Sequence, residues 1–264
     1  MDDIEKAWAP ALQQIIQEIV GSSAPTRVIG IAGAQGSGKS TLAALLANRL
    51  NQHDIETVVV SLDDFYLTKA QRLELARQCH PLCQTRGVPG THDTQLLAQA
   101  LGVAQQGGGE FVLPVFDKGN DDRSGMRTCV GRCLILEGWC VGVTPQPDQL
   151  LQEPINTLER EEDSQGDWRR WVNQQITQDY LPLWQLMDYW VFLQVPGFAQ
   201  VYEWRAQQEQ AIAPELRMSE QALVRFIAHY ERLTHWQLSQ PRSFRPGVQV
   251  ALNADHEITQ VKRL

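Results

Sequence analysis

The sequence predicts an α/β protein whose sheet is mostly parallel and covered by helices on both faces. Short, largely apolar segments predict buried strands at 27–33, 57–62, 132–138 and 189–195. Segments with helical spacing stand between them, at 41–50, 69–78 and 93–105. Continuously apolar strands separated by helices are typical of parallel sheets. Ligands of such sheets bind beyond the carboxyl ends of the strands, so functional residues are expected there.

Helical segments at both ends extend this pattern. Apolar residues three or four apart predict an amphipathic helix in 1–20, and its regular part is expected from near Pro10, because proline fits best in a first turn. Residues 144–167 contain three early prolines and a late EREED run, and they predict a surface insertion. Residues 198–239 predict a helical lid, broken near Ala213 and Pro214. We expect one domain over 1–264, with 1–24 as its N-terminal helix and linker.

Composition limits the class of protein. The 264 residues carry a formal net charge of −8 and a mean hydropathy of −0.31. Such a charge repels polyanions, so we expect no nucleic-acid partner, and any bound phosphate must be met by a local site. No apolar run approaches the roughly 18 to 20 residues that cross a bilayer, and the MDDIEK start is acidic where a signal peptide is basic. We therefore expect a cytoplasmic protein with no membrane partner; the sequence leaves its oligomeric state open.

The five cysteines are expected to be reduced thiols, because their number is odd and no export signal is seen. Cys79 with Cys83, and Cys129 with Cys133, form two C-x3-C pairs, a spacing that can bind zinc. Cys133 begins the apolar run CLIL, so a small buried thiol is the simpler interpretation.

A phosphate-binding loop is the strongest motif. GAQGSGKS, at 33–40, fits G-x-x-x-x-G-K-[ST] and stands between a predicted strand and a predicted helix, as that motif requires. Its glycines let backbone N–H groups turn toward phosphate oxygens, and the following helix adds the positive end of its dipole. Lys39 is expected to reach the β and γ phosphates of ATP, and Ser40 to ligate Mg²⁺. The expected nucleotide-binding residues are Gly33, Ala34, Gln35, Gly36, Ser37, Gly38, Lys39, Ser40 and Thr41.

Acidic residues at two predicted strand ends are candidates for catalysis. Glu137 ends the strand in ILEG, where Mg²⁺ or a bound water would compensate its burial; the alternative is a carboxylate that leaves the strand into solvent. Asp63 and Asp64 follow the second strand, and the T-x-x-Q capping box of Thr68 and Gln71 makes neither necessary as a helix cap. Consecutive residues at a strand end point in opposite directions. One aspartate is therefore expected to face the nucleotide and take a proton from an acceptor hydroxyl, with a solvated pair as the alternative.

The acceptor side is expected to carry cations and hydrogen-bond donors. Arginine binds a carboxylate through two parallel hydrogen bonds, a geometry that lysine does not offer. Tyr66 can add a wall or a hydrogen bond. The alternative for each loop cation is a solvated charge, and for the histidine it is helix capping by its neighbours. The candidates in predicted loops are Arg86, His92, Lys118 and Arg123.

With these motifs, the chain resembles the P-loop small-molecule kinases that include uridine kinase, pantothenate kinase and phosphoribulokinase. GAQGSGKST, DDFY and ILEG occur in that order and at similar intervals. A narrower resemblance, to the D-glycerate 3-kinase branch, covers most of the chain between residues 27 and 252. It rests on VSLDDFYLT (60–68), RGVPGTHD (86–93), PVFDKG (114–119), LILEGWCVG (134–142) and VYEWRAQQE (201–209).

The resemblance implies a P-loop kinase fold with a helical lid and MgATP-dependent phosphorylation of a small hydroxylated metabolite. Asp63 matches the first acid of the D-x-F-Y element, which acts as the base in that family, and Asp64 takes the less fixed second position on the acceptor side. Glu137 matches the strand-end acid near Mg²⁺. Arg205 lies in a W-R-x-Q-x-E element similar to a phosphate-covering lid. NDDRSG after PVFDKG and the 144–167 insertion depart from the family pattern.

The sequence therefore predicts an ATP-dependent kinase, with D-glycerate to 3-phosphoglycerate as the specific hypothesis. The guanine signature N-K-x-D and the transporter signature L-S-G-G-Q do not occur. Lys39 and Arg205 are expected to neutralise the transferring phosphoryl group. Arg86 and Lys118 favour an acidic acceptor over a nucleoside, and pantothenate or uridine phosphorylation are the alternatives within the kinases. Outside the kinases, the alternative is a regulatory protein that uses the nucleotide as a switch.

Overall fold

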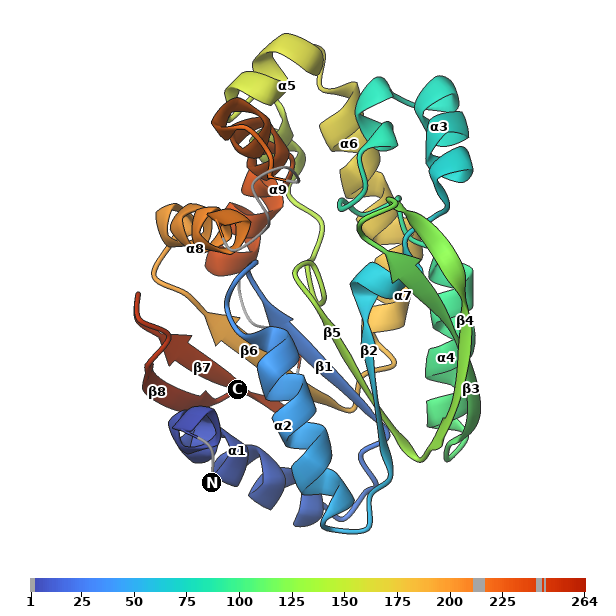
Figure 1. Cartoon of the computed structure of the whole chain (residues 1–264), viewed down its shortest axis with the longest axis vertical. Helices are drawn as coiled ribbons and strands as arrows, with labels where there is room; N and C mark the ends of the chain where they lie inside the picture. The colour runs from blue at the N-terminus through green and yellow to red at the C-terminus, as the bar shows by residue number, and fades with distance from the viewer. Residues whose placement is uncertain (1–2, 211–216, 241–243, 245) are drawn as a thin grey trace.

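A six-stranded sheet in the order β2-β5-β1-β6-β7-β8 forms the centre of the molecule (Figure 1). The computed structural model describes residues 3–210, 217–240, 244 and 246–264. Neighbouring strands are parallel, except that β8 runs antiparallel to β7. This confirms the mostly parallel α/β fold that the sequence predicts. The strands are β1 Val28–Gly33, β2 Thr57–Ser61, β5 Cys133–Gly138, β6 Tyr189–Gln194, β7 Gly247–Leu252 and β8 Ile258–Arg263.

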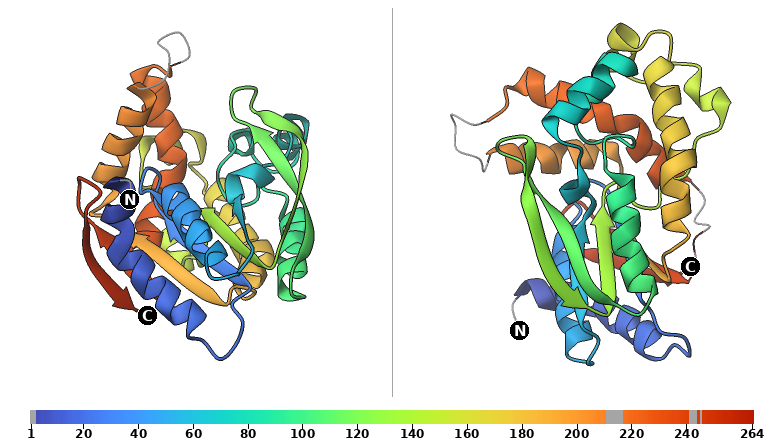
Figure 2. Two further views of the ribbon diagram at one scale, coloured as in Figure 1. Left: turned by 60° about the horizontal axis from the view of Figure 1, so that its bottom comes forward. Right: turned by 90° about the vertical axis from the view of Figure 1, so that its right-hand side faces the viewer.

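Helices cover both faces of this sheet (Figure 2). Successive residues of β1 point to opposite faces, so one strand contributes to two cores. Ile29 and Ile31 pack with helices α1 and α2, whereas Val28 and Ala32 pack with α4, α6 and α7. The bounds are α1 Asp3–Val20, α2 Lys39–Asn51, α4 Thr94–Gln105, α6 Asp167–Gln175 and α7 Leu181–Trp184.

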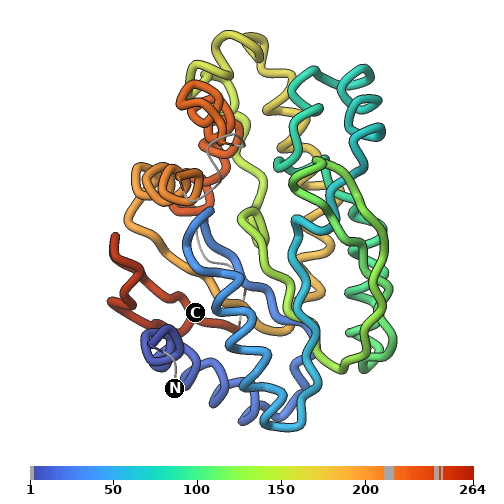
Figure 3. The backbone as a smooth tube through the Cα atoms, viewed as in Figure 1, coloured from blue at the N-terminus to red at the C-terminus, as the bar shows by residue number. Residues whose placement is uncertain are grey.

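Helix α1 begins earlier than the sequence predicts. It starts at Asp3 and contains Pro10, although regular helix is expected only from near that proline. A proline inside a helix removes one backbone hydrogen bond. Burial of Trp8, Leu12 and Ile15 against the sheet offsets that loss. Helix α1 packs against β8, so the first helix and the last strand of the described chain lie side by side (Figure 3).

A second, two-stranded sheet was not predicted. It is an antiparallel hairpin of β3 (Gly109–Asp117) and β4 (Asp122–Gly131). Pro114 interrupts the apolar run and argues for a loop, yet it lies opposite Met126 in the paired ribbon. The hairpin is anchored because Phe111 and Leu113 are buried in the same core as α4. The turn between its strands carries Lys118 to Asp63.

The predicted lid consists of α8 (Phe198–Gln210) and α9 (Glu220–Ser239). The break expected near Ala213 and Pro214 lies outside the described residues. The segment 144–167 was predicted to be a surface insertion. In the structure its short helix α5 (Thr157–Glu162) also binds α9. There the carboxylate of Glu159 accepts hydrogen bonds of 2.7 and 2.6 Å from Arg232, and both side chains are buried.

The remaining elements are short. Helix α3 runs over Lys69–Gln78 and begins with the predicted capping box of Thr68 and Gln71. All five cysteines are free, and Cys133 is buried. No helix in the described ranges is both long enough and apolar enough to cross a membrane. In the part of the chain that the structure describes, 3-10 turns lie at Leu62–Phe65, Pro81–Gln84 and Asp148–Leu151, and a π-helical turn lies at Ile176–Tyr180.

Candidate active site

The loop between β1 and α2 has the geometry of a phosphate cradle. Gly36 and Gly38 have φ angles of 78° and 87°, values that an L side chain rarely adopts. Lys39 donates a hydrogen bond of 3.0 Å to the Ala34 carbonyl, which folds its side chain back over the loop. The Ser37 hydroxyl is buried and has no hydrogen-bond partner among the described residues. A polar group buried in this way is costly, so these residues fit a bound polyanion.

Two tryptophans pack against the glycines of this loop. A Cβ atom added at Gly38 would lie 2.9 Å from the Trp8 ring, and one added at Gly36 would lie 2.8 Å from Trp204 Cβ. The His256 ring stacks on Trp204 with centroids 4.1 Å apart, and its Nε2 lies 2.8 Å from the Gly36 carbonyl oxygen. The glycines are therefore needed both for the turn and for this close approach.

Asp63 lies just past the end of β2. The strand ends at Ser61, and Asp63 and Asp64 stand on the 3-10 turn Leu62–Phe65 rather than on the strand itself. The prediction that both aspartates end the strand, with alternating directions, is therefore wrong. Asp63 nevertheless lines the larger cavity of the site, and Asp64 does not. Burial raises the pKa of Asp64 above its usual value, and the charge of Arg127 opposes that shift.

Both carboxylate oxygens of Asp63 accept hydrogen bonds. The Tyr66 hydroxyl donates to Oδ1 at 2.8 Å, and the Lys118 ammonium donates to Oδ2 at 2.6 Å. Burial alone would raise the pKa of Asp63, but the charge and hydrogen bond of Lys118, with the Tyr66 hydrogen bond, bring it below the usual value. The same burial and the nearby Asp63 charge raise the pKa of Tyr66, so its hydroxyl stays a donor. Asp63 is thus held as a carboxylate.

Glu137 and Ser40 meet at the carboxyl end of the sheet. Parallel pairing places Glu137 opposite Ile31 of β1 and Ser61 of β2. The Ser40 hydroxyl donates to Glu137 Oε1 at 3.0 Å, and Glu137 is only 5% exposed. Burial lowers the pKa of Lys39, while the charges of Glu137 and Asp63 oppose that shift.

A hydroxyl beside a buried carboxylate fits Mg²⁺, which binds oxygen ligands and keeps waters and substrate phosphates in its shell. No group of three or more histidine, cysteine, aspartate or glutamate side chains in the described ranges could hold a metal ion. A Mg²⁺ ion held by Ser40 and Glu137 would take its remaining oxygen ligands from water and from the phosphates of a nucleotide.

The proposed acceptor residues separate into two groups. Arg86 and Lys118 line the larger cavity together with Tyr66. Arg86 forms an ion pair with Asp121, which also binds the buried Arg72 at 3.0 Å.

His92 and Arg123 do not line either described cavity. The His92 ring stacks on Tyr66 with centroids 4.6 Å apart, and its Nδ1 lies 2.7 Å from the Tyr180 hydroxyl. Burial lowers the pKa of His92 to about 4, so the ring is neutral. Arg123 binds Asp93 and the Tyr66 carbonyl. Both residues therefore contact the Tyr66 segment without lining the cavity.

Arg205 of the lid also lines the larger cavity. Its guanidinium lies 2.9 Å from Glu209 Oε2 and 5.6 Å from the centre of the Phe226 ring. Helix α8 thus places a cation on the wall of this cavity, where it is paired with a buried carboxylate of the same helix.

The larger cavity has a volume of about 1160 Å³ and unites most of the predicted site. Sequence reasoning missed Tyr230 of α9, whose hydroxyl donates to the Arg86 carbonyl at 3.1 Å. It also missed Trp139, whose indole N–H donates to the Gly87 carbonyl. Trp139 directly follows the predicted Glu137-Gly138 strand end, which is a signal for it, whereas nothing in the sequence around Tyr230 points to the site. The predicted residues in this cavity are Gln35, Gly36, Lys39, Ser40, Asp63, Tyr66, Arg86, Lys118, Glu137 and Arg205.

The chain is similar to known P-loop proteins and kinases. A sequence profile of the KAP family P-loop domain matches residues 8–86. An uncharacterized kinase of Schizosaccharomyces pombe is 36% identical over 218 residues, 77% of this chain and 78% of the relative. The chloroplastic D-glycerate 3-kinase of Arabidopsis thaliana is 28% identical over 80% of this chain and 47% of its own. The solved structure of D-glycerate 3-kinase from Cryptococcus neoformans superposes with a TM-score of 0.76 at 26% identity, covering 100% of both chains.

Proposed function

The chain belongs to the P-loop kinases of the glycerate kinase branch, and on that premise we propose that it phosphorylates an alcohol of a small hydroxylated acid, with D-glycerate to 3-phosphoglycerate as the specific reaction. One observation carries the proposal. A single cavity brings the Asp63 carboxylate and the P-loop Lys39 together with the cations Arg86 and Lys118. A base, a phosphate clamp and a carboxylate-binding surface are the parts that this reaction needs.

Asp63 is the group that takes the proton of the acceptor hydroxyl. A positioned base of this kind contributes roughly 10²- to 10⁴-fold to a rate. The Tyr66 hydrogen bond fixes the orientation of its carboxylate. Lys118 holds the second oxygen, and its side chain is 62% exposed. An acceptor carboxylate draws the Lys118 ammonium toward itself and releases Asp63 Oδ2 for the hydroxyl.

Lys39 and Arg205 neutralise charge on the transferring phosphoryl group. Transfer from ATP depends on positioning and on electrostatic stabilisation rather than on covalent chemistry by the protein. Lys39 extends from the P-loop, and Arg205, which is paired with Glu209, lines the same cavity from the lid. Mg²⁺, held by Ser40 and Glu137 directly or through water, would supply further neutralisation of the triphosphate. A closed lid excludes water, which otherwise competes with the acceptor.

An ADP-release assay with an acceptor panel tests this function. The panel contains D-glycerate, pantothenate, uridine and ribulose 5-phosphate, each with MgATP, and NMR identifies the phosphorylated carbon of any product. We expect D-glycerate to stimulate ADP release and to be phosphorylated at its primary alcohol. Stimulation by uridine or pantothenate alone would assign a different acceptor. ADP release that no acceptor stimulates would favour a nucleotide-operated switch.

Lys39→Ala serves as the control in the same assay. It removes the cation of the cradle, so both turnover and ATP affinity are expected to fall. Full activity in this variant would mean that the cradle does not bind the transferred phosphates.

A further inference from the structure

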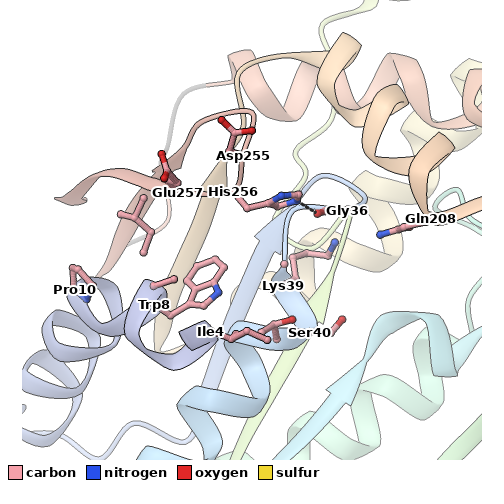
Figure 4. A pocket seen from close by; sticks show the side chains of 14 residues that line it. Ile4, Trp8, Pro10, Gly36, Lys39, Ser40, Gln208, Asp255, His256 and Glu257 are labelled. Atoms are coloured by element: carbon pink, nitrogen blue, oxygen red, sulfur yellow. Dashed lines mark hydrogen bonds between the residues drawn. The ribbon is translucent and has the colours of Figure 1, made fainter. Parts of the chain in front are cut away.

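Two cavities meet at the P-loop, and the two donors to the Asp63 carboxylate lie in the larger one. The smaller cavity, of about 900 Å³, opens beside α1 and the turn between β7 and β8 (Figure 4), and neither donor lines it. The donors differ in burial, since the Lys118 side chain is 62% exposed and Tyr66 is only 3% exposed. The orientation of Asp63 therefore depends chiefly on what holds Tyr66.

The Tyr66 ring is held by His92. Two backbone hydrogen bonds, of 2.9 and 2.7 Å, join residues 65–67 to residues 91–93, and Tyr66 stands opposite His92 in this antiparallel bridge. Side chains that are opposite each other in such a pairing stand on one face and come into contact. The two rings accordingly stack, with centroids 4.6 Å apart and planes at 25°. Rotation of the His92 ring would therefore displace the Tyr66 ring and its hydroxyl.

The His92 ring is in turn held by Tyr180. The Tyr180 hydroxyl accepts a hydrogen bond of 2.8 Å from the Gly90 N–H, and it lies 2.7 Å from His92 Nδ1. A hydroxyl has one proton to donate, and among the described residues Nδ1 is the acceptor within its reach. Nδ1 therefore accepts this hydrogen bond, and the neutral ring carries its own proton on Nε2.

A histidine at this position is costly. His92 Nε2 is buried and has no hydrogen-bond partner among the described residues, and an unpaired polar group in the interior is unfavourable. A phenylalanine would also stack on Tyr66 and would avoid this cost. The imidazole is therefore explained by its hydrogen bond to Tyr180, which a phenyl ring cannot form.

Tyr180 itself lies outside both cavities. It ends the π-helical turn Ile176–Tyr180, and its side chain is fully buried. Turns of this kind are rare and occur frequently at functional sites. Because neither Tyr180 nor His92 lines a cavity, any effect of the pair on the reaction passes through Tyr66.

We propose that Tyr180 is a positioning residue for Asp63. Its hydroxyl fixes the His92 ring, the ring fixes Tyr66, and the Tyr66 hydroxyl holds Asp63 Oδ1 at 2.8 Å. The inference rests on the proposed function only where it concerns turnover, because the contacts themselves need neither nucleotide nor acceptor.

NMR at neutral pH, without nucleotide or acceptor, tests the contacts. In wild type, nitrogen NMR should show His92 protonated at Nε2 and unprotonated at Nδ1; a proton on Nδ1 would overturn the proposal. Carbon NMR should place the Tyr66 ring resonance of Tyr180→Phe between those of wild type and Asp63→Ala, a variant in which Tyr66 has lost its acceptor. A Tyr66 resonance that is unchanged in Tyr180→Phe would also overturn it.

Turnover at saturating MgATP and acceptor tests the effect on the reaction. Tyr180→Phe and His92→Phe each break the same hydrogen bond and keep a ring, so kcat should fall about three- to tenfold in each. ATP affinity should stay within about twofold of wild type, because neither residue lines a cavity. In the Tyr66→Phe background, Tyr180→Phe should change kcat by less than about twofold, since no hydroxyl remains to be positioned. An undiminished loss in that background would contradict the proposal.

Tyr189→Phe is the matched control. Tyr189 is also buried, and its hydroxyl donates a hydrogen bond of 2.8 Å to Glu18. It lies toward the opposite end of the sheet, where it pairs with Ile29 near the start of β1. This variant should leave kcat and the Tyr66 resonance unchanged, and effects equal to those of Tyr180→Phe would overturn the proposal. If no acceptor is phosphorylated, the proposed function fails, and the NMR measurements still decide the positioning.

Discussion

Lys118→Met is expected to raise the pKa of Asp63 by about one to two units. Lys118 Nζ lies 2.6 Å from Asp63 Oδ2, and the two side chains are 62% and 27% exposed. At that distance two unit charges attract by about 1.6 kcal/mol even with the dielectric constant of water, and one pKa unit corresponds to about 1.4 kcal/mol. Because Lys118 is exposed, the attraction between the two charges stays near this lower bound. Loss of the hydrogen bond from Lys118 raises the pKa of Asp63 further. Removing the cation favours the neutral carboxyl, so the pKa rises.

Carbon-detected NMR titration of the aspartate carboxyl groups measures this shift directly, with Asp63→Asn identifying the resonance. In the acceptor-dependent assay, the acid limb of kcat/KM should move upward by the same amount. Lys69→Met is the matched control, because Lys69 lines the same cavity but is not hydrogen-bonded to Asp63. An unchanged or lower pKa of Asp63 in Lys118→Met would refute the reasoning. So would an equal rise in Lys69→Met.

Three further predictions concern the surroundings of Asp63 and the lid. Tyr66→Phe removes a hydrogen bond of 2.8 Å to Asp63, and turnover should fall about tenfold or more; an unchanged kcat would contradict this. Glu209→Gln frees Arg205, and ATP should bind about three- to fivefold more tightly in calorimetry, since a carboxylate no longer competes with phosphate; weaker binding would count against the lid role. Because burial lowers the pKa of His92 to about 4, the unfolded chain binds a proton between pH 4 and about 6.5 that the native protein does not, and stability is lost as pH falls. Between pH 7 and 5, wild type should lose about 2 kcal/mol more stability in urea unfolding than His92→Gln; equal losses would contradict it.

The parallel core could be predicted because its signals are local. Each strand of the type RVIGIAG is a short apolar run, and the residues that begin the next helix follow within a few positions. The β3–β4 hairpin was missed because Pro114 lies inside a strand that has a neighbour on only one side, where a missing N–H is tolerated. The early start of α1 depends on burial of Trp8 against the P-loop, which is a tertiary contact.

Most of the residues that were predicted for the site line one cavity, whereas the contacts that hold them in place could not be predicted from the sequence. GAQGSGKS and ILEG place their residues beside one another simply because neighbouring parallel strands end at the same edge. The pairing of Lys118 with Asp63 depends on where a hairpin turn falls, 55 residues along the chain. Nothing in the sequence distinguishes His92 and Arg123 from the loop cations that line the cavity. Their contacts with Tyr66, which depend on tertiary packing, keep both residues out of the cavity lining.

The central claim is that Asp63 is the base for transfer from ATP to an acceptor alcohol. The most direct measurement compares D-glycerate-dependent ADP formation by wild type and Asp63→Asn at saturating MgATP, with ATP affinity determined for both. We predict a fall in turnover of about 10²- to 10⁴-fold in Asp63→Asn, with ATP affinity nearly unchanged. Equal turnover in the two proteins would contradict the account.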